Sequence, residues 1–160
     1  MPEFQFLRRE YRGSLDDRYR ITLPEPLLTA VIEDRERCVL VKERPYSISV
    51  WDEDVWNAEM ESGISLVEAK LARSRLRDRL DQVRQLGRLL ASQHERVRLD
   101  GRGRLRVLES FRDFLGAEPG ADLVIVPAAV CIEIWRPDAW IEYLHQEMPS
   151  FRQLLEELAG

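Results

Sequence analysis

The feature that most constrains this chain is an internal repeat, in which the pattern of residues 11–60 recurs in residues 95–144. When the two stretches are aligned without a gap, ten of the fifty pairs are identical, and all four tryptophans fall into matched pairs. Self-similarity at a fixed offset is typical of a duplicated structural unit, so the two stretches are predicted to share a fold. The identical pairs are Arg12/Arg96, Leu15/Leu99, Asp16/Asp100, Arg18/Arg102, Arg20/Arg104, Glu25/Glu109, Ile48/Ile132, Trp51/Trp135, Asp54/Asp138 and Trp56/Trp140.

Each unit has the same predicted order of elements. The motif Asp-x-x-x-Arg is followed by a short strand (RITL, RLRV), a short helix (PEPLLTAV, ESFRDFLG) and two apolar, β-branched strands (VLV and ISVW, then LVIV and CIEIW). Gly116 is expected to end the second short helix. A further helix is expected after each strand that ends in tryptophan, with Asp52 as an N-cap and Pro137 at a first helical position. The tryptophans themselves are expected to pack in the core or between subunits.

This pattern predicts an α+β protein with four segments. Residues 1–62 and 93–146 are the two repeats, 63–92 form an amphipathic helical connector, and 147–160 form a C-terminal helical tail. About fifty residues cannot bury enough surface alone, so the repeats are predicted to complete one pseudo-two-fold β-barrel together. The connector is predicted to be one long helix, and the apolar side chains of the tail are expected to face inward. The apolar positions are Leu76, Leu80, Val83, Leu86 and Leu90 in the connector, and Phe151, Leu154, Leu155 and Leu158 in the tail.

The charge distribution matters more than the net charge of −5. Residues 68–106 carry a net charge of +7, whereas the flanking segments 1–67 and 107–160 carry −5 and −7. A basic middle segment can present a positive surface even in an acidic protein. The connector arginines at positions 73, 75, 77 and 79 alternate and therefore scatter around a helix. They are compatible with a solvated or subunit-contacting face and also with nucleic-acid binding.

Several function classes are disfavoured by the sequence. No apolar run approaches the roughly 20 residues of a membrane helix, and the N-terminus has no signal-peptide pattern, so we expect a cytoplasmic protein. Cys38 and Cys131 lie in apolar surroundings and are expected to be buried free thiols. Neither cysteine nor histidine spacing indicates a metal, and no cofactor is predicted. No nucleophile–base pair or phosphate-cradling glycine loop is apparent, so an enzyme is not expected.

The segment LDGRGRLR predicts a tight hairpin turn. Asp100 and Gly103 occupy the first and fourth positions of a type I turn, with Gly103 in the left-handed conformation. Asp100, like Asp16 in the first copy, is expected to stabilise its turn by accepting backbone hydrogen bonds. Four arginines in and after the two turns are suited to bind phosphates or the edge of a guanine base. For Arg104, an ion pair with Asp100 that only holds the loop is the alternative role. The candidate DNA-binding residues are Arg18, Arg20, Arg102 and Arg104.

The combined pattern resembles the MraZ family of bacterial transcriptional regulators. The resemblance runs through REYRGSLDDRYRITLP, VRLDGRGRLRV and CIEIWRPDAWIEYL. It implies two swapped-hairpin units of the AbrB type, ring-shaped homo-oligomers, and binding of double-stranded DNA at promoter direct repeats of a division and cell-wall gene cluster. It also implies a nucleoid-associated protein. The matching positions for the family motif are Asp16 with Arg20 and Asp100 with Arg104.

Two positions depart from the family pattern, Tyr19 in place of glycine and Leu108 in place of proline. Tyr19 occupies the place of Gly103 and would need a positive φ, which is strained for a residue with a Cβ. A relaxed first turn is the expected outcome, and a retained, strained tyrosine is the alternative. The competing functional hypotheses are an oligomeric scaffold barrel that has lost DNA binding and an AbrB-like antitoxin.

Overall fold

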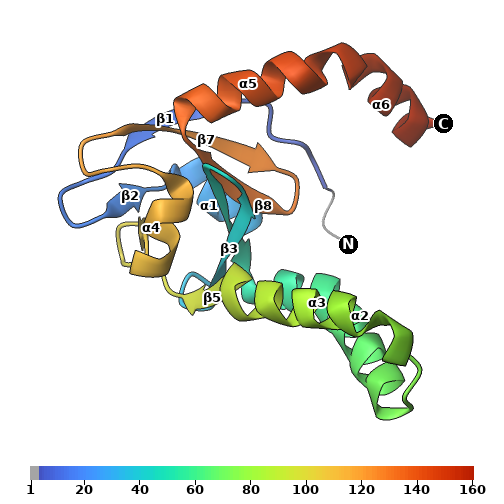
Figure 1. The fold of residues 1–160 in the computed structure, drawn as a ribbon. Helices are drawn as coiled ribbons and strands as arrows, with labels where there is room; N and C mark the ends of the chain where they lie inside the picture. The colour runs from blue at the N-terminus through green and yellow to red at the C-terminus, as the bar shows by residue number, and fades with distance from the viewer. Residues whose placement is uncertain (1–3) are drawn as a thin grey trace.

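The computed structural model describes residues 4–160, and its two repeats contain the same elements in the same order (Figure 1). The first repeat consists of β1 (Tyr11–Ser14), β2 (Arg20–Thr22), α1 (Glu25–Val31), β3 (Cys38–Arg44) and β4 (Ser47–Asp52). The second consists of β5 (His94–Val97), β6 (Arg104–Arg106), α4 (Glu109–Leu115), β7 (Asp122–Ala128) and β8 (Cys131–Trp135). Every strand and short helix predicted from the repeat is confirmed, and Gly116 follows α4 with a φ of 70°.

Six strands form one antiparallel sheet in the order β1-β7-β8-β4-β3-β5. This order is symmetric about the central pair, in which Ile48 lies opposite Ile134 and Val50 opposite Ile132. Each edge strand pairs with the other repeat: β1 with β7, and β5 with β3. Because each repeat supplies an edge strand to the other, the two repeats form one body.

The predicted closed barrel is not confirmed, because the sheet is open. Strands β2 and β6 pair only with each other, in a separate two-stranded ladder, so β1 and β5 remain the edges of the six-stranded sheet. The two repeats share a core because helices and a second ladder pack on the sheet in layers, and not because the strands close into a barrel. The β2–β6 ladder and the helices α1 and α4 cover one face of the sheet, around side chains such as Ile21, Leu105, Leu28 and Phe111.

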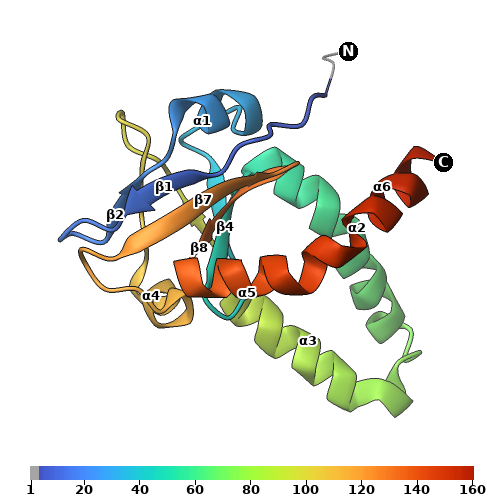
Figure 2. The ribbon, with the colours of Figure 1, turned by 90° about the horizontal axis from the view of Figure 1, so that it is seen from above.

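Two longer helices cover the opposite face of the sheet (Figure 2). α2 (Glu53–Ala72) packs over β3 and β4, and α5 (Pro137–Glu147) packs over β7. The tryptophan ring centroids lie 5.3 Å apart for Trp51 and Trp56, and 5.2 Å apart for Trp135 and Trp140. The expected packing role of the tryptophans is therefore confirmed, and each pair anchors one helix to the sheet.

The predicted single connector helix is wrong. α2 runs through residue 63 and ends at Ala72, a 3₁₀ turn spans Arg77–Arg79, and α3 (Leu80–Gln93) returns toward β5. Ser74 adopts a φ of 56° at the break. The arginines at 73 and 77, and at 75 and 79, would be like-charge neighbours in a continuous helix, which disfavours one. The α2–α3 arm that results has half-buried apolar residues along both helices and in the turn between them: Ile64, Val67, Leu76, Val83, Leu86 and Leu90.

The C-terminal tail forms a helix as predicted, but its orientation differs from the prediction. A 3₁₀ turn (Met148–Ser150) leads into α6 (Phe151–Ala159). All of the apolar side chains of α6 are exposed, by 57% for Phe151 and 78% for Leu158. The tail leaves the body with α5, and within residues 4–160 nothing covers its apolar side chains (Figure 1).

Candidate nucleic-acid interface

The β2–β6 ladder separates buried apolar side chains from outward polar ones. Ile21 and Leu105 lie opposite each other and are fully buried. Because side chains alternate along a strand, the neighbours Arg20, Thr22, Arg104 and Arg106 lie on the other face of the ladder. Three of these four residues are arginines, so this face is basic.

The second turn is held by a network that centres on Asp100. Its Oδ1 atom accepts hydrogen bonds from the backbone N–H groups of Arg102 at 2.9 Å and Arg104 at 3.0 Å. Its Oδ2 atom accepts from Arg104 Nε at 2.6 Å. The N–H of Gly103 donates to the Asp100 carbonyl at 3.0 Å, and Gly103 has a φ of 72°. The predicted turn is present, with its left-handed glycine and its backbone-bonded aspartate, but the predicted hairpin is wrong, because β5 pairs with β3 and β6 pairs with β2.

The first turn repeats this network bond for bond. Asp16 Oδ1 accepts from the N–H groups of Arg18 at 2.9 Å and Arg20 at 2.8 Å, and Oδ2 accepts from Arg20 Nε at 2.9 Å. The backbone N–H groups of Arg20 and Arg104 are the main cause that lowers the pKa values of Asp16 and Asp100. Both aspartates therefore remain ionised near neutral pH and hold the arginine that follows them.

The two ion pairs orient the guanidinium groups of Arg20 and Arg104. In both side chains the Nε atom is bonded to an aspartate, and 26% of the side-chain surface is exposed. Within the described residues, no hydrogen bond engages the Nη atoms of either arginine. A guanidinium held in this way keeps its outer N–H groups for a second, external acceptor. The ion pair that holds the loop and a binding role are therefore compatible in one residue.

Arg106 is a basic residue of this face that the motif did not identify. It lies directly opposite Arg20 on the ladder. The bonds from Leu23 N to Gly103 O and from Val107 N to Tyr19 O place Arg20 and Arg106 in a non-hydrogen-bonded pair, where side chains approach closely. Like charges directly opposite each other are unfavourable, and an anion between them relieves the repulsion. The alternation of charged and apolar residues in RLRV indicated that Arg106 lies on the same side of its strand as Arg104. The sequence did not indicate which strand pairs with it.

Tyr19 keeps the conformation of the glycine that it replaces. Its φ is 58°, so the prediction of a relaxed turn is wrong, and the tyrosine keeps the strained, left-handed conformation. The guanidinium carbon of Arg112 lies 3.8 Å from the centre of the Tyr19 ring. In the second repeat, the corresponding space beside Gly103 is filled by Leu28, whose Cδ1 would lie 2.6 Å from an added Cβ. Arg112 and Leu28 are themselves matched positions of the repeat, so the pair Tyr19–Arg112 takes the place of the pair Gly103–Leu28.

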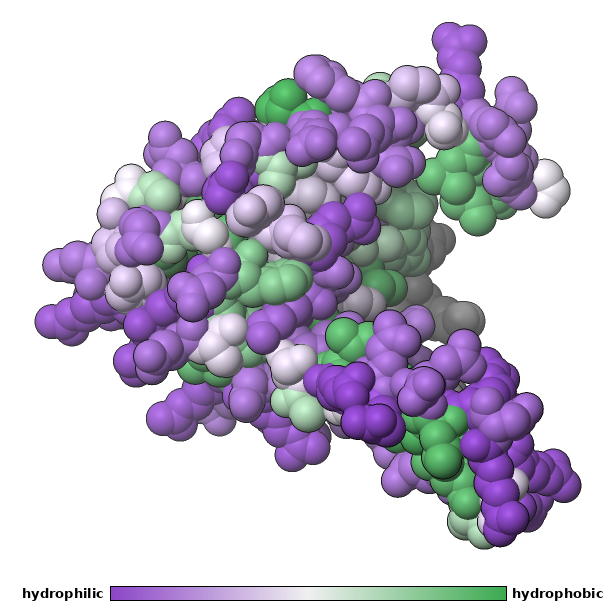
Figure 3. Space-filling view, in the orientation of Figure 1, coloured by the Kyte–Doolittle hydropathy of each residue, from purple (hydrophilic) through white to green (hydrophobic). Residues whose placement is uncertain are grey.

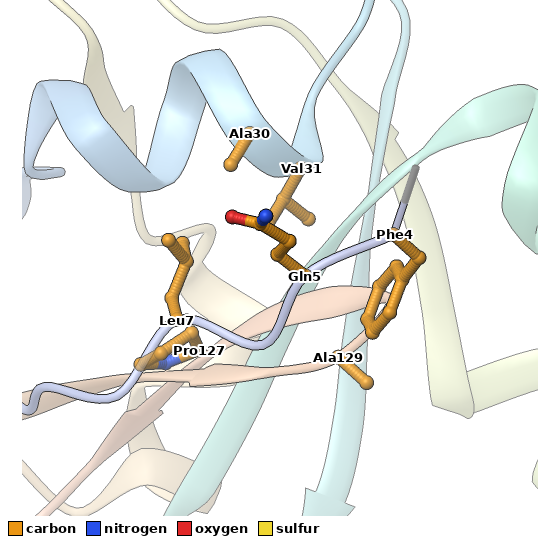
Figure 4. Close-up of a pocket in the computed structure, with 7 residues that line it drawn as sticks. All are labelled: Phe4, Gln5, Leu7, Ala30, Val31, Pro127 and Ala129. Atoms are coloured by element: carbon orange, nitrogen blue, oxygen red, sulfur yellow. The ribbon is translucent and has the colours of Figure 1, made fainter. Parts of the chain in front are cut away.

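One cavity lies beside this face, and another lies away from it. One of about 350 Å³ adjoins Tyr19 and is lined by charged residues of α4, among them Glu109, Arg112 and Asp113. The other, of about 400 Å³, lies between the N-terminal segment, α1 and the β7–β8 hairpin (Figure 4). In Figure 4, Gln5 points toward Ala30 and Val31, and the described residues that line this cavity include no ionisable side chain.

The remaining predicted groups have structural surroundings. Cys38 and Cys131 are buried free thiols, and burial raises the pKa of Cys38 to about 12. Asp52 stands at the start of α2 but makes no bond to the helix, because its Oδ1 accepts from the N–H groups of Glu33 and Asp34. Residues 4–160 contain no group of three or more His, Cys, Asp or Glu side chains suited to a metal ion, and none of their helices could span a membrane.

Comparison with known proteins agrees with the motif. Residues 90–159 match the family model described as "MraZ protein, putative antitoxin-like". The chain is 28% identical over 149 residues to the transcriptional regulator MraZ of Syntrophomonas wolfei, covering 93% of this chain and 94% of the relative. It is 26% identical over 153 residues to the regulator of the same name from Thermus thermophilus, covering 94% and 97%.

A third relative with the same name, from Thioalkalivibrio sulfidiphilus, is 28% identical over 130 residues, covering 81% of this chain and 79% of the relative. These relatives are named as transcriptional regulators, so the expectation of a non-enzymatic protein is confirmed. The matches to the first two relatives extend over so much of the chain that they include both Asp-x-x-x-Arg turns. The chain is therefore similar to the MraZ family model over residues 90–159 and to regulators named MraZ over most of its length.

Proposed function

We propose that this protein is a DNA-binding transcriptional regulator that contacts the duplex through the basic face of the β2–β6 ladder. The contact residues in this proposal are Arg18, Arg20, Arg102, Arg104 and Arg106. The observation that carries it is the identical network in the two turns, which fixes one arginine in each repeat through its Nε atom and leaves its outer nitrogens without a hydrogen bond among the described residues. The names of the relatives support the same general function.

The geometry of the face suits a nucleic acid. A two-stranded β-ribbon fits the major groove, where an arginine fork can bond to the O6 and N7 atoms of guanine. The same forks bind phosphate oxygens when they lie at the groove edge. Arg18 and Arg102 stand at the exposed turn tips, and Arg106 adds a third strand-borne guanidinium. Residues 16–22 and 100–106 together carry five arginines and three aspartates, so the two turns and their strands are net positive despite the net charge of −5.

Assembly and target are part of the same proposal. A single small basic face binds weakly, so several copies on promoter direct repeats supply the affinity through avidity. The self-association is a homo-oligomeric ring, and the target is the promoter of a division and cell-wall gene cluster, as the family resemblance implies. The regulator acts in the cytoplasm and associates with the nucleoid.

The test is DNA binding by arginine variants at several salt concentrations. Fluorescence anisotropy with the DNA upstream of the gene itself would compare Arg20→Ala, Arg104→Ala and Arg106→Ala with the unchanged protein. Loss of a phosphate contact lowers the slope of log affinity against log salt by about one unit per residue. Loss of a base contact lowers specificity by about 1–3 kcal/mol at one position. Arg84→Ala, an exposed arginine of α3, is the matched control.

Three results decide between the hypotheses. Weaker binding in the three face variants with an unchanged Arg84→Ala variant supports the proposal. Unchanged binding in all three, with far-ultraviolet circular dichroism and oligomer size also unchanged, contradicts it. Absence of any salt-dependent binding by the unchanged protein leaves the scaffold hypothesis, since the turns then serve only the fold.

A further inference from the structure

The apolar face of α6 is a helix surface without a partner. Phe151, Leu154, Leu155 and Leu158 follow one another at helical spacing, and each is more than half exposed. Figure 3 shows this hydrophobic group at the end of the C-terminal arm and a second one on the α2–α3 arm, with open space between them. Monomeric proteins seldom expose a contiguous apolar patch of this kind, which marks an interaction surface.

The repeat indicates what kind of surface covers this face. When the alignment of the two repeats is continued along the chain, Ile64, Val67 and Leu71 of α2 correspond to Met148, Phe151 and Leu155. The end of α2 is therefore the counterpart of α6. In the first repeat, α3 folds back beside α2, and Val67 and Val83 line one groove between the two helices. Within residues 4–160, no helix covers the apolar face of α6 in the way that α3 lies beside α2.

Charge selects the partner surface. Residues 137–160 carry five acidic side chains and one basic side chain, a net charge of −4. Residues 70–90, on the α2–α3 arm, carry seven basic and two acidic side chains, a net charge of +5. The groove of the arm has an apolar floor that includes Leu76, Val83 and Leu86, and Lys70 and Arg79 also line it. Two copies of α6 would repel each other through these acidic residues, whereas α6 and the arm are complementary in both charge and hydrophobicity.

We propose that α6 of one copy docks on the α2–α3 arm of a second copy. The leucine face of α6 covers the groove between α2 and α3, and Glu156 and Glu157 lie near Lys70 and Arg79 of the neighbour. In the described residues, no hydrogen bond or ion pair joins α6 to the arm of its own chain. The contact uses two different surfaces, so it repeats from copy to copy and yields a closed ring when the rotation permits.

This inference rests on the proposed function only for the idea of self-association, and it names the two surfaces that produce it. It also assigns Arg79, one of the four connector arginines, to a subunit contact, which is one of the roles that the sequence left open. DNA is not needed for the test, so a failure of DNA binding and a failure of this contact are separate results.

The first experiment measures molar mass by size-exclusion chromatography with light scattering over a dilution series. Leu155→Glu places a charge in the apolar face of α6 and is expected to weaken assembly by about 30-fold or more, the loss typical of a hot-spot residue. Gln153→Glu introduces the same charge on the opposite side of α6, away from the apolar face, and keeps the assembly. On the arm, the double variant Lys70→Glu/Arg79→Glu is expected to be monomeric, whereas Arg75→Glu/Arg88→Glu, outside the groove, retains assembly.

The second experiment mixes the two monomeric variants. Leu155→Glu keeps an intact arm, and Lys70→Glu/Arg79→Glu keeps an intact α6. If α6 binds the arm, the mixture forms a one-to-one dimer that cannot grow. An arm variant that still assembles alone would indicate pairing of α6 with α6 and overturn the proposal. Unchanged mass in Leu155→Glu, with unchanged circular dichroism, would also overturn it.

Discussion

Replacing Tyr19 by alanine and, separately, by glycine tests the left-handed conformation of the first turn. Both variants remove the ring that packs against the core and against Arg112. Loss of the cation–π contact costs about 0.5–1 kcal/mol, and loss of the half-buried ring costs about 1 kcal/mol more. Both variants are therefore expected to be less stable than the unchanged protein.

The two variants differ in the conformational strain that remains. A φ of 58° costs a residue with a Cβ about 1–2 kcal/mol, and glycine escapes this cost. Glycine in turn loses about 0.4–1 kcal/mol through the greater freedom of the unfolded chain. We therefore expect Tyr19→Gly to be more stable than Tyr19→Ala by about 0.5–1 kcal/mol, which is the reverse of the order at an ordinary position.

Urea midpoints at one fixed protein concentration measure this difference, because self-association makes apparent stability depend on concentration. Gly103→Ala is the matched variant in the second turn. Gly103 has a φ of 72°, and a Cβ added there would also lie 2.6 Å from Leu28 Cδ1. Gly103→Ala should therefore lower the stability by more than the difference between Tyr19→Ala and Tyr19→Gly. A Tyr19→Ala variant that is more stable than Tyr19→Gly would refute the left-handed turn.

Two further predictions concern carboxylates whose pKa values are shifted in opposite directions. Burial raises the pKa of Glu133, whose Oε1 accepts a hydrogen bond from Trp135 Nε1, so the ionised form of Glu133 disfavours folding. Glu133→Gln should therefore raise the melting temperature at pH 7. This gain should shrink at low pH, because Glu133 itself is then protonated. Backbone bonds lower the pKa of Asp100, so its stabilisation is present above the ordinary aspartate pKa of about 3.9 and is lost as pH falls through the lower folded value. Asp100→Asn should accordingly lower the melting temperature at pH 7 more than at pH 3, whereas Asp17→Asn in the exposed first turn should have little effect at either pH. Equal losses for Asp100→Asn at both pH values, or no gain for Glu133→Gln at pH 7, would contradict these expectations.

The sequence by itself determined the features that depend on near neighbours along the chain. The gapless match between residues 11–60 and 95–144 defined the two units and the order of their strands. The spacing from Asp100 to Arg104 determined the turn, because a type I turn with a left-handed fourth residue needs only the bonds within that short segment. The apolar helix of the tail was likewise evident from its spacing. These are local interactions, and their residue types specify them directly.

Only the tertiary structure decided which segments meet. Whether the strands close into a barrel depends on hydrogen bonds between distant segments, and the β2–β6 ladder leaves the main sheet open. Arg106 became a candidate only when pairing placed it opposite Arg20. Tyr19 keeps its strained φ because Arg112, which belongs to the other repeat, packs over its ring. Within residues 4–160 the apolar face of α6 is exposed, which its spacing could not show, because a periodic pattern specifies a face but not the surface that covers it.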